Sequence, residues 1–416
     1  VGAGRVVVGR DTRASGPMLQ HAVHCGLLAA GCEVVDVGVL PTPTIQIYTG
    51  ATHARGGLAI TASHNPPEYN ALKMFNAQGL FFNHYERGEL LDIYHQSAVR
   101  QATNEEIRRV TADPAGPEKL HFDRVLQHVD LDCIRARRFR VALDAVNGAG
   151  SRLSVRFLQD VLGCELHAIS VDPEKPFPRV PEPRPDTLGS LAALVRETHC
   201  DIGFGQDPDG DRLAVADERG FVLDNDEVLA LVIEAVLQRN PGPVVVNLTT
   251  SAVVDDIARR YGVQVHRTPV GEANVVDTMQ AVKAVIGGEG NNGGIIFPAV
   301  HYCRDSYTGM AFLLDHMART GSRVSELHSH LPRYYRKLGQ VPFEHGRLGP
   351  LTQALENTFP AAIRDRSDGL KLILPDGWIH VRASNTEPIL RLAAEAKSEA
   401  RLDELFNAVT FVVRGS

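Results

Sequence analysis

Short apolar runs alternate with stretches of helical periodicity through most of this chain, in an order that repeats three times. Residues 5–9, 139–143 and 243–246 are β-branched or apolar runs, and each leads into a polar turn and a helix-like stretch. A glycine and a second strand follow in each unit, then a further helical stretch and a third strand. This order predicts a largely parallel sheet covered by helices, with right-handed crossovers. We therefore expect three related domains, with a chance likeness between strand–helix units as the alternative.

The end of the chain shows a different pattern. Residues 369–374 and 378–382 are strand-like runs on either side of a Pro-Asp-Gly turn, and a third run at 389–394 precedes a closing helix. A hairpin with one more strand and a helix is typical of an α+β domain. The expected fold class is α/β, with three related, mixed but mainly parallel α/β domains followed by a smaller α+β C-terminal domain.

Proline-rich segments separate these units. The runs PAGP at 114–117 and NPGP at 240–243 mark the first two boundaries, and the stretch 173–185 can form neither a helix nor a central strand. We expect that stretch to cross the surface near the cleft of the second domain. The predicted domains cover residues 1–117, 118–240, 241–345 and 346–416.

The third strand of each α/β unit ends in a polar loop, and the three loops differ in chemistry. They read TASHNPP at 61–67, QDPDGDR at 206–212 and GEGNNGG at 288–294. Ligands of α/β folds collect at the carboxyl ends of strands, so equivalent loops of three domains can face one cleft. We expect a nucleophile, a metal site and a substrate clamp to meet there.

The second loop places three carboxylates, Asp207, Asp209 and Asp211, on alternate residues, so a curved loop can direct them at one cation. Hard oxygen ligands suit Mg²⁺ or Ca²⁺. An EF-hand is excluded because Arg212 occupies the position where that motif requires glycine. Three protein oxygens underfill an octahedral Mg²⁺ site, so a phosphate oxygen is expected to complete it. A solvated acidic turn is the alternative.

The first loop offers Ser63 and His64 at a strand end, with Lys73 a few residues later. By itself, a serine–histidine pair is more often a capping or turn feature than a catalytic one. Opposite a metal loop, however, a phosphorylated Ser63 would supply the missing metal oxygen and act as a phosphoryl donor. Lys73 would then serve as proton shuttle or charge stabiliser.

Two further loops have groups that bind sugars and phosphates. Glu289 with Asn291 and Asn292 can hydrogen-bond vicinal sugar hydroxyls, whereas a phosphate cradle is the competing interpretation that Glu289 disfavours by repulsion. The turn that starts at Arg382 offers a guanidinium, hydroxyls, an amide and backbone N–H groups, which favours phosphate binding over a plain hairpin turn. The predicted phosphate ligands are Arg382, Ser384, Asn385 and Thr386.

Taken in order, these loops resemble the α-D-phosphohexomutase superfamily over nearly the whole chain. TASHNP at 61–66 is similar to its phosphoserine loop, DPDGDR at 207–212 to its Mg²⁺ loop and RASNTEP at 382–388 to its phosphate-binding loop. The sugar loop EGNNGG at 289–294 lacks the histidine of many members and resembles the variant of archaeal-type phosphoglucosamine mutases. The resemblance implies, in chain order, phosphoserine-loop, metal-binding, sugar-binding and phosphate-binding domains.

The resemblance also implies a mechanism. Phosphorylated Ser63 would donate to a hexose monophosphate, the resulting 1,6-bisphosphate would turn over in the cleft, and its other phosphate would return to Ser63. The implied metal ligands of Mg²⁺ are Ser63, Asp207, Asp209 and Asp211. The implied catalytic residues are Ser63, His64, Lys73, Arg212 and Arg10. The implied substrate-binding residues are Thr268, Gly271, Glu289, Asn291, Asn292, Arg304, Arg382, Ser384, Asn385 and Thr386.

Two further departures from the family pattern affect these assignments. The chain begins at the strand before Gly9-Arg10-Asp11, without a counterpart of the preceding segment that carries another active-site arginine. Arg267 stands where several members have a lysine, and because an arginine does not act as a base at ordinary pH, Lys73 is the better shuttle candidate.

Composition narrows the function further. The net charge of −7 argues against nucleic-acid binding, which needs a basic face. No run of 18 apolar residues predicts a membrane span, and the first residues show no signal-peptide pattern. Six scattered cysteines without a Cys-x-x-Cys pair favour free thiols in a reducing cytoplasm over a zinc site. We expect a cytoplasmic monomer or homodimer.

The sequence thus predicts a Mg²⁺-dependent phosphohexomutase acting on hexose monophosphates and a bisphosphate, with glucosamine phosphate ahead of mannose or glucose phosphate. A metal-dependent phosphatase is a rival, but a hydrolase needs no site for a second phosphate. An inactive sugar-phosphate-binding homologue is the alternative from a different class.

Overall fold

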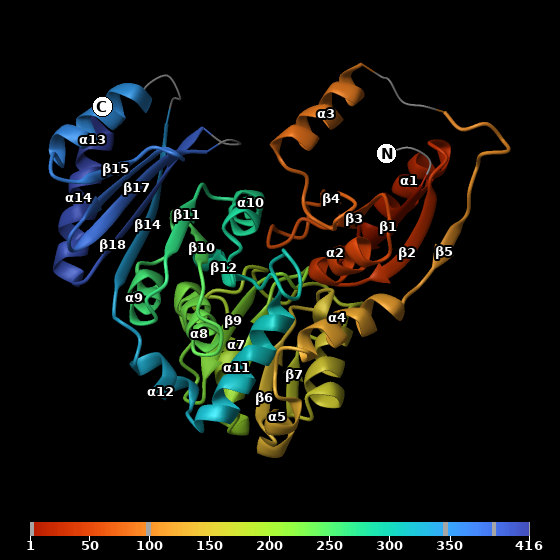
Figure 1. Cartoon of the computed structure of the whole chain (residues 1–416), viewed down its shortest axis with the longest axis horizontal. Helices are drawn as coiled ribbons and strands as arrows, with labels where there is room; N and C mark the ends of the chain where they lie inside the picture. The colour runs from red at the N-terminus through yellow and green to blue at the C-terminus, as the bar shows by residue number, and fades with distance from the viewer. Residues whose placement is uncertain (1–3, 97–100, 344–347, 385–387, 416) are drawn as a thin grey trace.

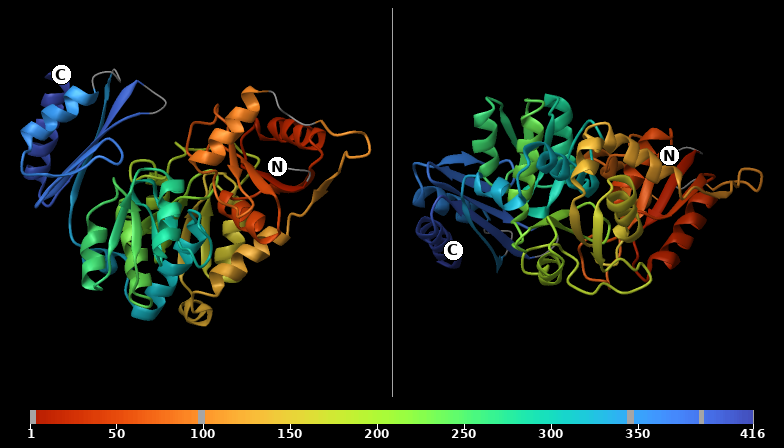
Figure 2. Two further views of the ribbon diagram at one scale, coloured as in Figure 1. Left: turned by 45° about the horizontal axis from the view of Figure 1, so that its top comes forward. Right: turned by 90° about the horizontal axis from the view of Figure 1, so that it is seen from below.

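The computed structural model describes residues 4–96, 101–343, 348–384 and 388–415. Figure 1 shows four domains in chain order, with the first at one end of the molecule, the second and third in the middle and the fourth at the other end. The two further views in Figure 2 show the same arrangement. In the part of the chain that is described, no helix has the length and apolarity needed to cross a bilayer.

The first domain has a five-stranded sheet with helices on both faces. Along β1, Val6 and Val8 face the α1 side, whereas Val7 faces the α2 side, as the alternation of a strand requires. Its strands are β1 (Arg5–Arg10), β2 (Glu33–Val39), β3 (Gly56–Ile60), β4 (Leu72–Phe75) and β5 (Val110–Ala112). Its helices are α1 (Gly16–Ala29), α2 (Thr42–Ala51) and α3 (His84–His95).

The second domain has a four-stranded sheet whose third and fourth strands are buried along their whole length. The stretch 173–185 contains neither helix nor strand, in agreement with its proline content. The strands are β6 (Arg140–Asp144), β7 (Glu165–Ile169), β8 (Ile202–Gln206) and β9 (Leu213–Asp217). The helices are α4 (Gly116–Leu126), α5 (Leu131–Arg137), α6 (Gly150–Val155) with the π-helical turn η1 (Arg156–Val161), and α7 (Gly189–Thr198).

The third domain repeats this sheet. Helix α8 (Asn225–Leu237), almost entirely buried, packs against both β9 of the second domain and β12 of the third and joins the two. The strands are β10 (Val244–Asn247), β11 (Val265–Thr268), β12 (Ile286–Glu289) and β13 (Gly294–Ile296). The helices are α9 (Val253–Arg260), α10 (Glu272–Val282), the 3₁₀ turn η2 (Gly290–Asn292), α11 (Ser306–Thr320) and α12 (Val324–Ser329).

The fourth domain is an antiparallel sheet of order β14-β18-β17-β16-β15 with two helices, which confirms the predicted α+β fold. Strand β14 pairs with β18, so this sheet begins at Tyr335, before the boundary expected at residue 346. The strands are β14 (Tyr335–Pro342), β15 (Ile363–Asp365), β16 (Leu370–Leu374), β17 (Gly377–Ala383) and β18 (Ile389–Ala396). The helices are α13 (Leu348–Thr358) and α14 (Glu399–Gly415).

The three α/β sheets share one strand order. In each, the first strand lies between the second and third in parallel pairing, and the fourth strand pairs antiparallel with the third. The orders are β2-β1-β3-β4, β7-β6-β8-β9 and β11-β10-β12-β13, with β5 added beside β2. The identical order confirms the predicted relation between the three domains.

The apolar cores do not follow the division into four domains. One continuous cluster runs from Val7 of the first domain through the second domain to Leu327 of the third, whereas the fourth domain has a separate core between Leu351 and Val409. The first three domains are therefore packed together by buried apolar surface, and the fourth is joined to them by other contacts.

Gly287 in β12 shows how closely the third sheet is packed. A Cβ at this position would lie 1.9 Å from the carbonyl oxygen of Val245 on the neighbouring strand. We expect Gly287→Ala to destabilise the protein by about 1–3 kcal/mol and to lower its melting temperature in thermal unfolding. The control is Gly26→Ala in α1, where a Cβ meets nothing within 4 Å and should stabilise slightly. Equal melting temperatures for both variants would contradict this account.

Candidate active site

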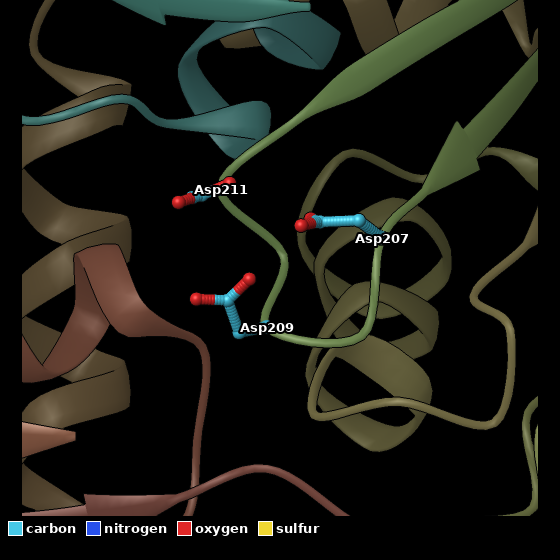
Figure 3. Close-up of side chains that lie close together, drawn as sticks. All are labelled: Asp207, Asp209 and Asp211. Atoms are coloured by element: carbon cyan, nitrogen blue, oxygen red, sulfur yellow. The ribbon is translucent and has the colours of Figure 1, made fainter. Parts of the chain in front are cut away.

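The loop between β8 and β9 brings its three carboxylates together. Oxygen atoms of Asp207, Asp209 and Asp211 all lie within 4.8 Å of one another, and the three residues are buried. Figure 3 shows the three side chains converging from one tight loop that joins two strands. The loop reverses at Gly210, which has the left-handed φ of 66° that glycine adopts without strain.

Neighbouring domains hold this loop in place. The backbone N–H of Thr42, at the start of α2, donates to the carbonyl of Asp209 at 2.9 Å, and the Thr42 hydroxyl donates to the carboxylate of the same residue at 2.5 Å. From α11, the Ser306 hydroxyl donates to the Gly210 carbonyl at 2.7 Å. The position of the carboxylates therefore depends on the packing of three domains.

Ser63 of the first domain lies against this loop. It follows β3, has a left-handed φ of 50°, and its Oγ donates to Asp207 Oδ2 at 2.7 Å. The strand ends of two successive repeats thus bring a hydroxyl and a carboxylate cluster into direct contact, although they are 144 positions apart in the chain.

Lys73, on the neighbouring strand β4, contacts the same cluster. Its Nζ lies 2.6 Å from Asp209 Oδ2 and 3.1 Å from Asp211 Oδ2. Burial lowers the pKa of Lys73, but the two carboxylates outweigh it and the net pKa is raised. The ammonium form is therefore favoured here, and this suits stabilisation of negative charge better than proton abstraction.

Arg212 and His64 present nitrogen atoms beside the cluster. Arg212 is buried, and its Nη1 donates to Glu182 at 2.9 Å, whereas its Nε lies 4.0 and 3.9 Å from the carboxylates of Asp207 and Asp211. Burial, and then the positive charge of Arg212, lowers the pKa of His64 to about 4, so its imidazole is neutral near pH 7. In the described part of the chain, neither Arg212 Nε nor His64 Nδ1 has a hydrogen-bond partner.

The donor set fits a divalent cation. Asp209 Oδ1 and Asp211 Oδ1 are buried and accept no hydrogen bond from any described residue. Burial, and then repulsion by Asp211 and Asp209, raises the pKa of Asp207 well above its usual range. Unsatisfied carboxylate oxygens that repel one another are the arrangement that a hard cation stabilises.

The predicted sugar loop lies next to these groups. Glu289 Oε1 accepts from Gly271 N at 2.8 Å and from Asn247 Nδ2 at 3.0 Å, so two of the predicted substrate residues contact each other. Asn291 accepts a hydrogen bond from Thr249 at 3.3 Å, and the Thr268 hydroxyl donates to the Pro269 carbonyl. Asn292 ends the 3₁₀ turn and is half-buried.

Arg304 is held by carboxylates. Its guanidinium lies 2.8 Å from Asp211, 2.8 Å from Glu272 and 3.4 Å from Glu289. It thus connects the aspartate loop of the second domain to the predicted sugar loop of the third. The positive charge of Arg304 therefore offsets part of the negative charge of these three carboxylates.

Arg382 of the fourth domain lies at the boundary with the third. Its Nη1 donates to Asp368 Oδ2 at 3.1 Å, and the same oxygen accepts from the backbone N–H of Val270 at 3.0 Å. Ser384, the residue directly after β17, is buried. The predicted residues Asn385 and Thr386 lie outside the described residues.

The structure places Arg10 away from this centre. Its Nε donates to Gln20 and its Nη1 to the Asp11 carbonyl, at 3.1 and 3.0 Å. It lines a cavity of about 820 Å³ formed by residues of the first two domains, whose walls include Arg152, Lys175 and Phe177. Arg10 is the last residue of β1, and its catalytic role stays a prediction.

Several residues that contact the site were not predicted, among them Thr42, Glu272 and Arg13. Thr42 binds Asp209, Glu272 pairs with Arg304, and Arg13 is buried behind Ser63. Arg13 lies in the run Asp11-Thr12-Arg13 directly after β1, at the end of the first strand of the first repeat. This place at a strand end is the sequence feature from which Arg13 could have been predicted as a site residue. Thr42 and Glu272 follow no such pattern.

Comparison with known proteins finds one family whose four domain models match this chain. Residues 1–100, 119–220 and 224–335 match the Phosphoglucomutase/phosphomannomutase alpha/beta/alpha domains I, II and III, and residues 349–410 match the C-terminal domain. This chain belongs to the phosphoglucomutase/phosphomannomutase family. The four matches follow the order in which the four sheets occur.

Individual relatives cover nearly all of the chain. A phosphoglucomutase/phosphomannomutase of Thermococcus kodakarensis is 39% identical over 96% of this chain and 87% of its own length. A probable phosphoglucosamine mutase of Methanopyrus kandleri is 36% identical over 100% of this chain and 91% of its own. Among solved structures, a family protein of Burkholderia thailandensis superposes with a TM-score of 0.85 at 28% identity, covering 100% of this chain and 90% of that one.

The carboxylate cluster predicts how Mg²⁺ affects stability. A ligand that binds only the folded state stabilises it, by about 2.7 kcal/mol at 100 times its dissociation constant. We expect Mg²⁺ to raise the melting temperature of the wild type. Asp207→Asn should abolish this shift and leave the melting temperature in EDTA equal or higher, because it removes one of three repelling charges. Asp315→Asn, a buried aspartate on α11 outside the site, is the control that keeps the shift. An unchanged Mg²⁺ shift in Asp207→Asn would contradict the assignment.

Proposed function

We propose that this protein is a phosphohexomutase that interconverts hexose 6-phosphate and hexose 1-phosphate through a phosphoserine enzyme and a hexose 1,6-bisphosphate. The observation that carries the proposal is the 2.7 Å contact between Ser63 Oγ and Asp207 in a buried cluster of three aspartates. Family membership supports it. A hydroxyl held against a candidate cation site at the strand ends of α/β domains suits phosphoryl transfer.

Glucosamine phosphate is the proposed substrate. The sugar loop EGNNGG resembles the variant of archaeal-type phosphoglucosamine mutases with one extra Asn, and relatives named probable phosphoglucosamine mutase match over essentially the full chain. Mannose or glucose phosphate is the second candidate, because the relative at 39% identity is named phosphoglucomutase/phosphomannomutase. Turnover measured on glucosamine, mannose and glucose 6-phosphates separates the two candidates.

In the proposed reaction Ser63 is the phosphoryl carrier. The P–O bond to Ser63 breaks as a P–O bond to the free sugar hydroxyl forms, and the proton of that hydroxyl ends on the Ser63 Oγ that leaves. After the bisphosphate turns over, its other phosphate returns to Ser63 and the monophosphate product leaves. Lys73 and His64 are the nearby groups for charge stabilisation and proton movement, and Arg212 Nε is a free donor for a phosphate oxygen.

We propose Mg²⁺ as the cation, held by Asp207, Asp209 and Asp211 with the Ser63 side chain. When bound, it would neutralise charge on the transferring phosphoryl group. Lys73 forms ion pairs with Asp209 and Asp211. The charges of its ammonium group and of the cation together would balance the three carboxylates. Arg304 contacts Asp211 as well, and its own charge faces Glu272 and Glu289 of the third domain.

We further propose that the fourth domain closes on the substrate through the turn that begins at Arg382. The bisphosphate must reorient within the site without dissociating. One of its phosphates must therefore be bound, released and bound again. The ion pair with Asp368 holds the Arg382 guanidinium at the domain boundary, from which it can exchange a carboxylate for a phosphate. We also propose a cytoplasmic location, which the six unpaired cysteines support, and a monomer or homodimer as the oligomeric state.

Removal of the Ser63 hydroxyl tests the carrier role. We expect Ser63→Ala to lower mutase turnover by several orders of magnitude while hexose-phosphate binding persists, because the covalent step is lost and the sugar and phosphate contacts are not. Intact-mass measurement should show about one phosphate on the wild type and none on the variant. Near-normal turnover in Ser63→Ala would end the proposal.

Removal of the Arg382 guanidinium tests the grip of the fourth domain. A charge-assisted bidentate contact contributes roughly 1.5–3 kcal/mol, so Arg382→Ala should raise KM about 10- to 150-fold. Bisphosphate should also leak into solution, where it can be counted by chromatography of the quenched reaction. Arg366→Ala, which removes an exposed arginine paired with Glu356 in the same domain, is the control. Unchanged KM and leakage would mean that this turn has no part in substrate binding.

A further inference from the structure

Arg13 binds the loop that carries Ser63 with four of its five guanidinium N–H donors. It is only 2% exposed, and its Nε donates to Asp11 Oδ2 at 2.9 Å. Its two terminal nitrogens donate to four carbonyl oxygens of one short loop. These belong to Ser63 (2.6 Å), Asn65 (2.8 Å), Pro66 (2.7 Å) and Tyr69 (2.9 Å).

Four carbonyl oxygens that point at one place repel one another unless a cation lies between them. The guanidinium of Arg13 fills that place. Ser63 also has a left-handed φ of 50°, which costs free energy for any residue with a Cβ. The loop conformation is therefore one that the local sequence disfavours and that Arg13 stabilises.

A second route reaches Ser63 from the same pair of residues. Asp11 accepts the backbone N–H of Arg13 at 2.9 Å and the hydroxyl of Thr61 at 2.7 Å. The Thr61 hydroxyl in turn accepts the backbone N–H of Ser63 at 2.9 Å. The Asp11–Arg13 pair thus holds Ser63 by its N–H through Thr61 and by its C=O directly.

The pair is also fixed to the second domain, which carries the metal loop. The ring of Phe177, in the proline-rich stretch, lies 5.2 Å from the Arg13 guanidinium carbon. The neighbouring Thr12 hydroxyl donates to the Asn147 carbonyl at 2.7 Å. Ser63 and Asp207 are therefore positioned from one shared framework.

We propose that Arg13 is a positioning residue for phosphoryl transfer, which keeps the strained Ser63 loop in the conformation that directs Oγ at the aspartate cluster. This inference rests on the proposed function of Ser63. A guanidinium has five N–H donors, and the five contacts to Asp11 and the four carbonyls use all of them. No donor is left for a phosphate, so Arg13 acts through Ser63 and does not bind the substrate.

The test is Arg13→Lys, which keeps the charge but replaces the planar fork by a single ammonium. We expect kcat to fall about 10- to 100-fold, as misplacement of a reacting group by a fraction of an ångström to one ångström does. KM for the hexose phosphate should stay within about twofold. Hydrogen exchange at the amides of residues 61–70 should be faster than in the wild type. Guanidinium ion should restore part of kcat to Arg13→Ala.

Two further variants make the result specific. Arg239→Lys changes an arginine that also bonds a carbonyl and a carboxylate, those of His128 and Asp315, far from Ser63, and should leave kcat and exchange at 61–70 unchanged. Thr61→Val removes only the link to the Ser63 N–H and should lower kcat by a smaller factor at constant KM. If Arg13→Lys does not fold, the measurements of kcat, KM and hydrogen exchange are made on Thr61→Val instead.

Three outcomes would overturn the proposal: unchanged exchange at 61–70 in Arg13→Lys, unchanged kcat, or a rise in KM with kcat preserved, which would indicate direct substrate contact. The exchange measurement needs no substrate. A wild type without mutase activity would therefore refute the proposed function, while faster exchange in the variant would still establish that Arg13 holds the loop.

Discussion

The burial of three carboxylates within 4.8 Å of one another is the constraint on which the rest of the site depends. Like charges in a desolvated loop are unstable alone, and burial, followed by repulsion from Asp211 and Asp209, raises the pKa of Asp207. Lys73 from the first domain and Arg304 from the third compensate Asp209 and Asp211. Because the compensating cations come from other domains, the metal loop can be buried only where three domains pack together. The continuous apolar core of those domains meets this requirement.

The fourth domain is attached by a different kind of contact. Its own apolar core is separate, and its junction with the third domain is built from buried polar groups. Lys371 donates to the Leu248 carbonyl and lies 4.2 Å from the Trp378 ring centre, and Glu395 accepts from the Ala252 N–H. Burial, and then the nearby Arg267, lowers the pKa of Lys371 well below its usual range. Hydrogen bonds can be exchanged for water at much lower cost than apolar surface can be exposed. This junction suits a domain that opens and closes over a fixed site.

Repetition of one sheet accounts for how the site was assembled. Each α/β domain ends its third strand at the same place in its sheet, and packing the domains together brings Ser63, Asp207 and Glu289 to one region. Arg304 then links the second loop to the third by ion pairs with Asp211 and Glu289. The shared fold supplies the placement, and the divergent loops supply three different chemistries.

The sequence alone determined the elements, the three related sheets, the α+β character of the last domain and the loops that carry the chemistry, because these follow from local periodicity and from residue types at strand ends. The tertiary structure decided which side chains touch. Arg10 ends β1 and Arg13 lies three positions later, yet Arg13 bonds the Ser63 loop whereas Arg10 bonds Gln20 and Asp11. Thr42 and Glu272 bind their partners across long stretches of sequence, and β14 joins the fourth sheet by pairing with β18. Contacts of this kind depend on how domains pack and on where each side chain points, and neither property is written in a local pattern of apolar and polar residues.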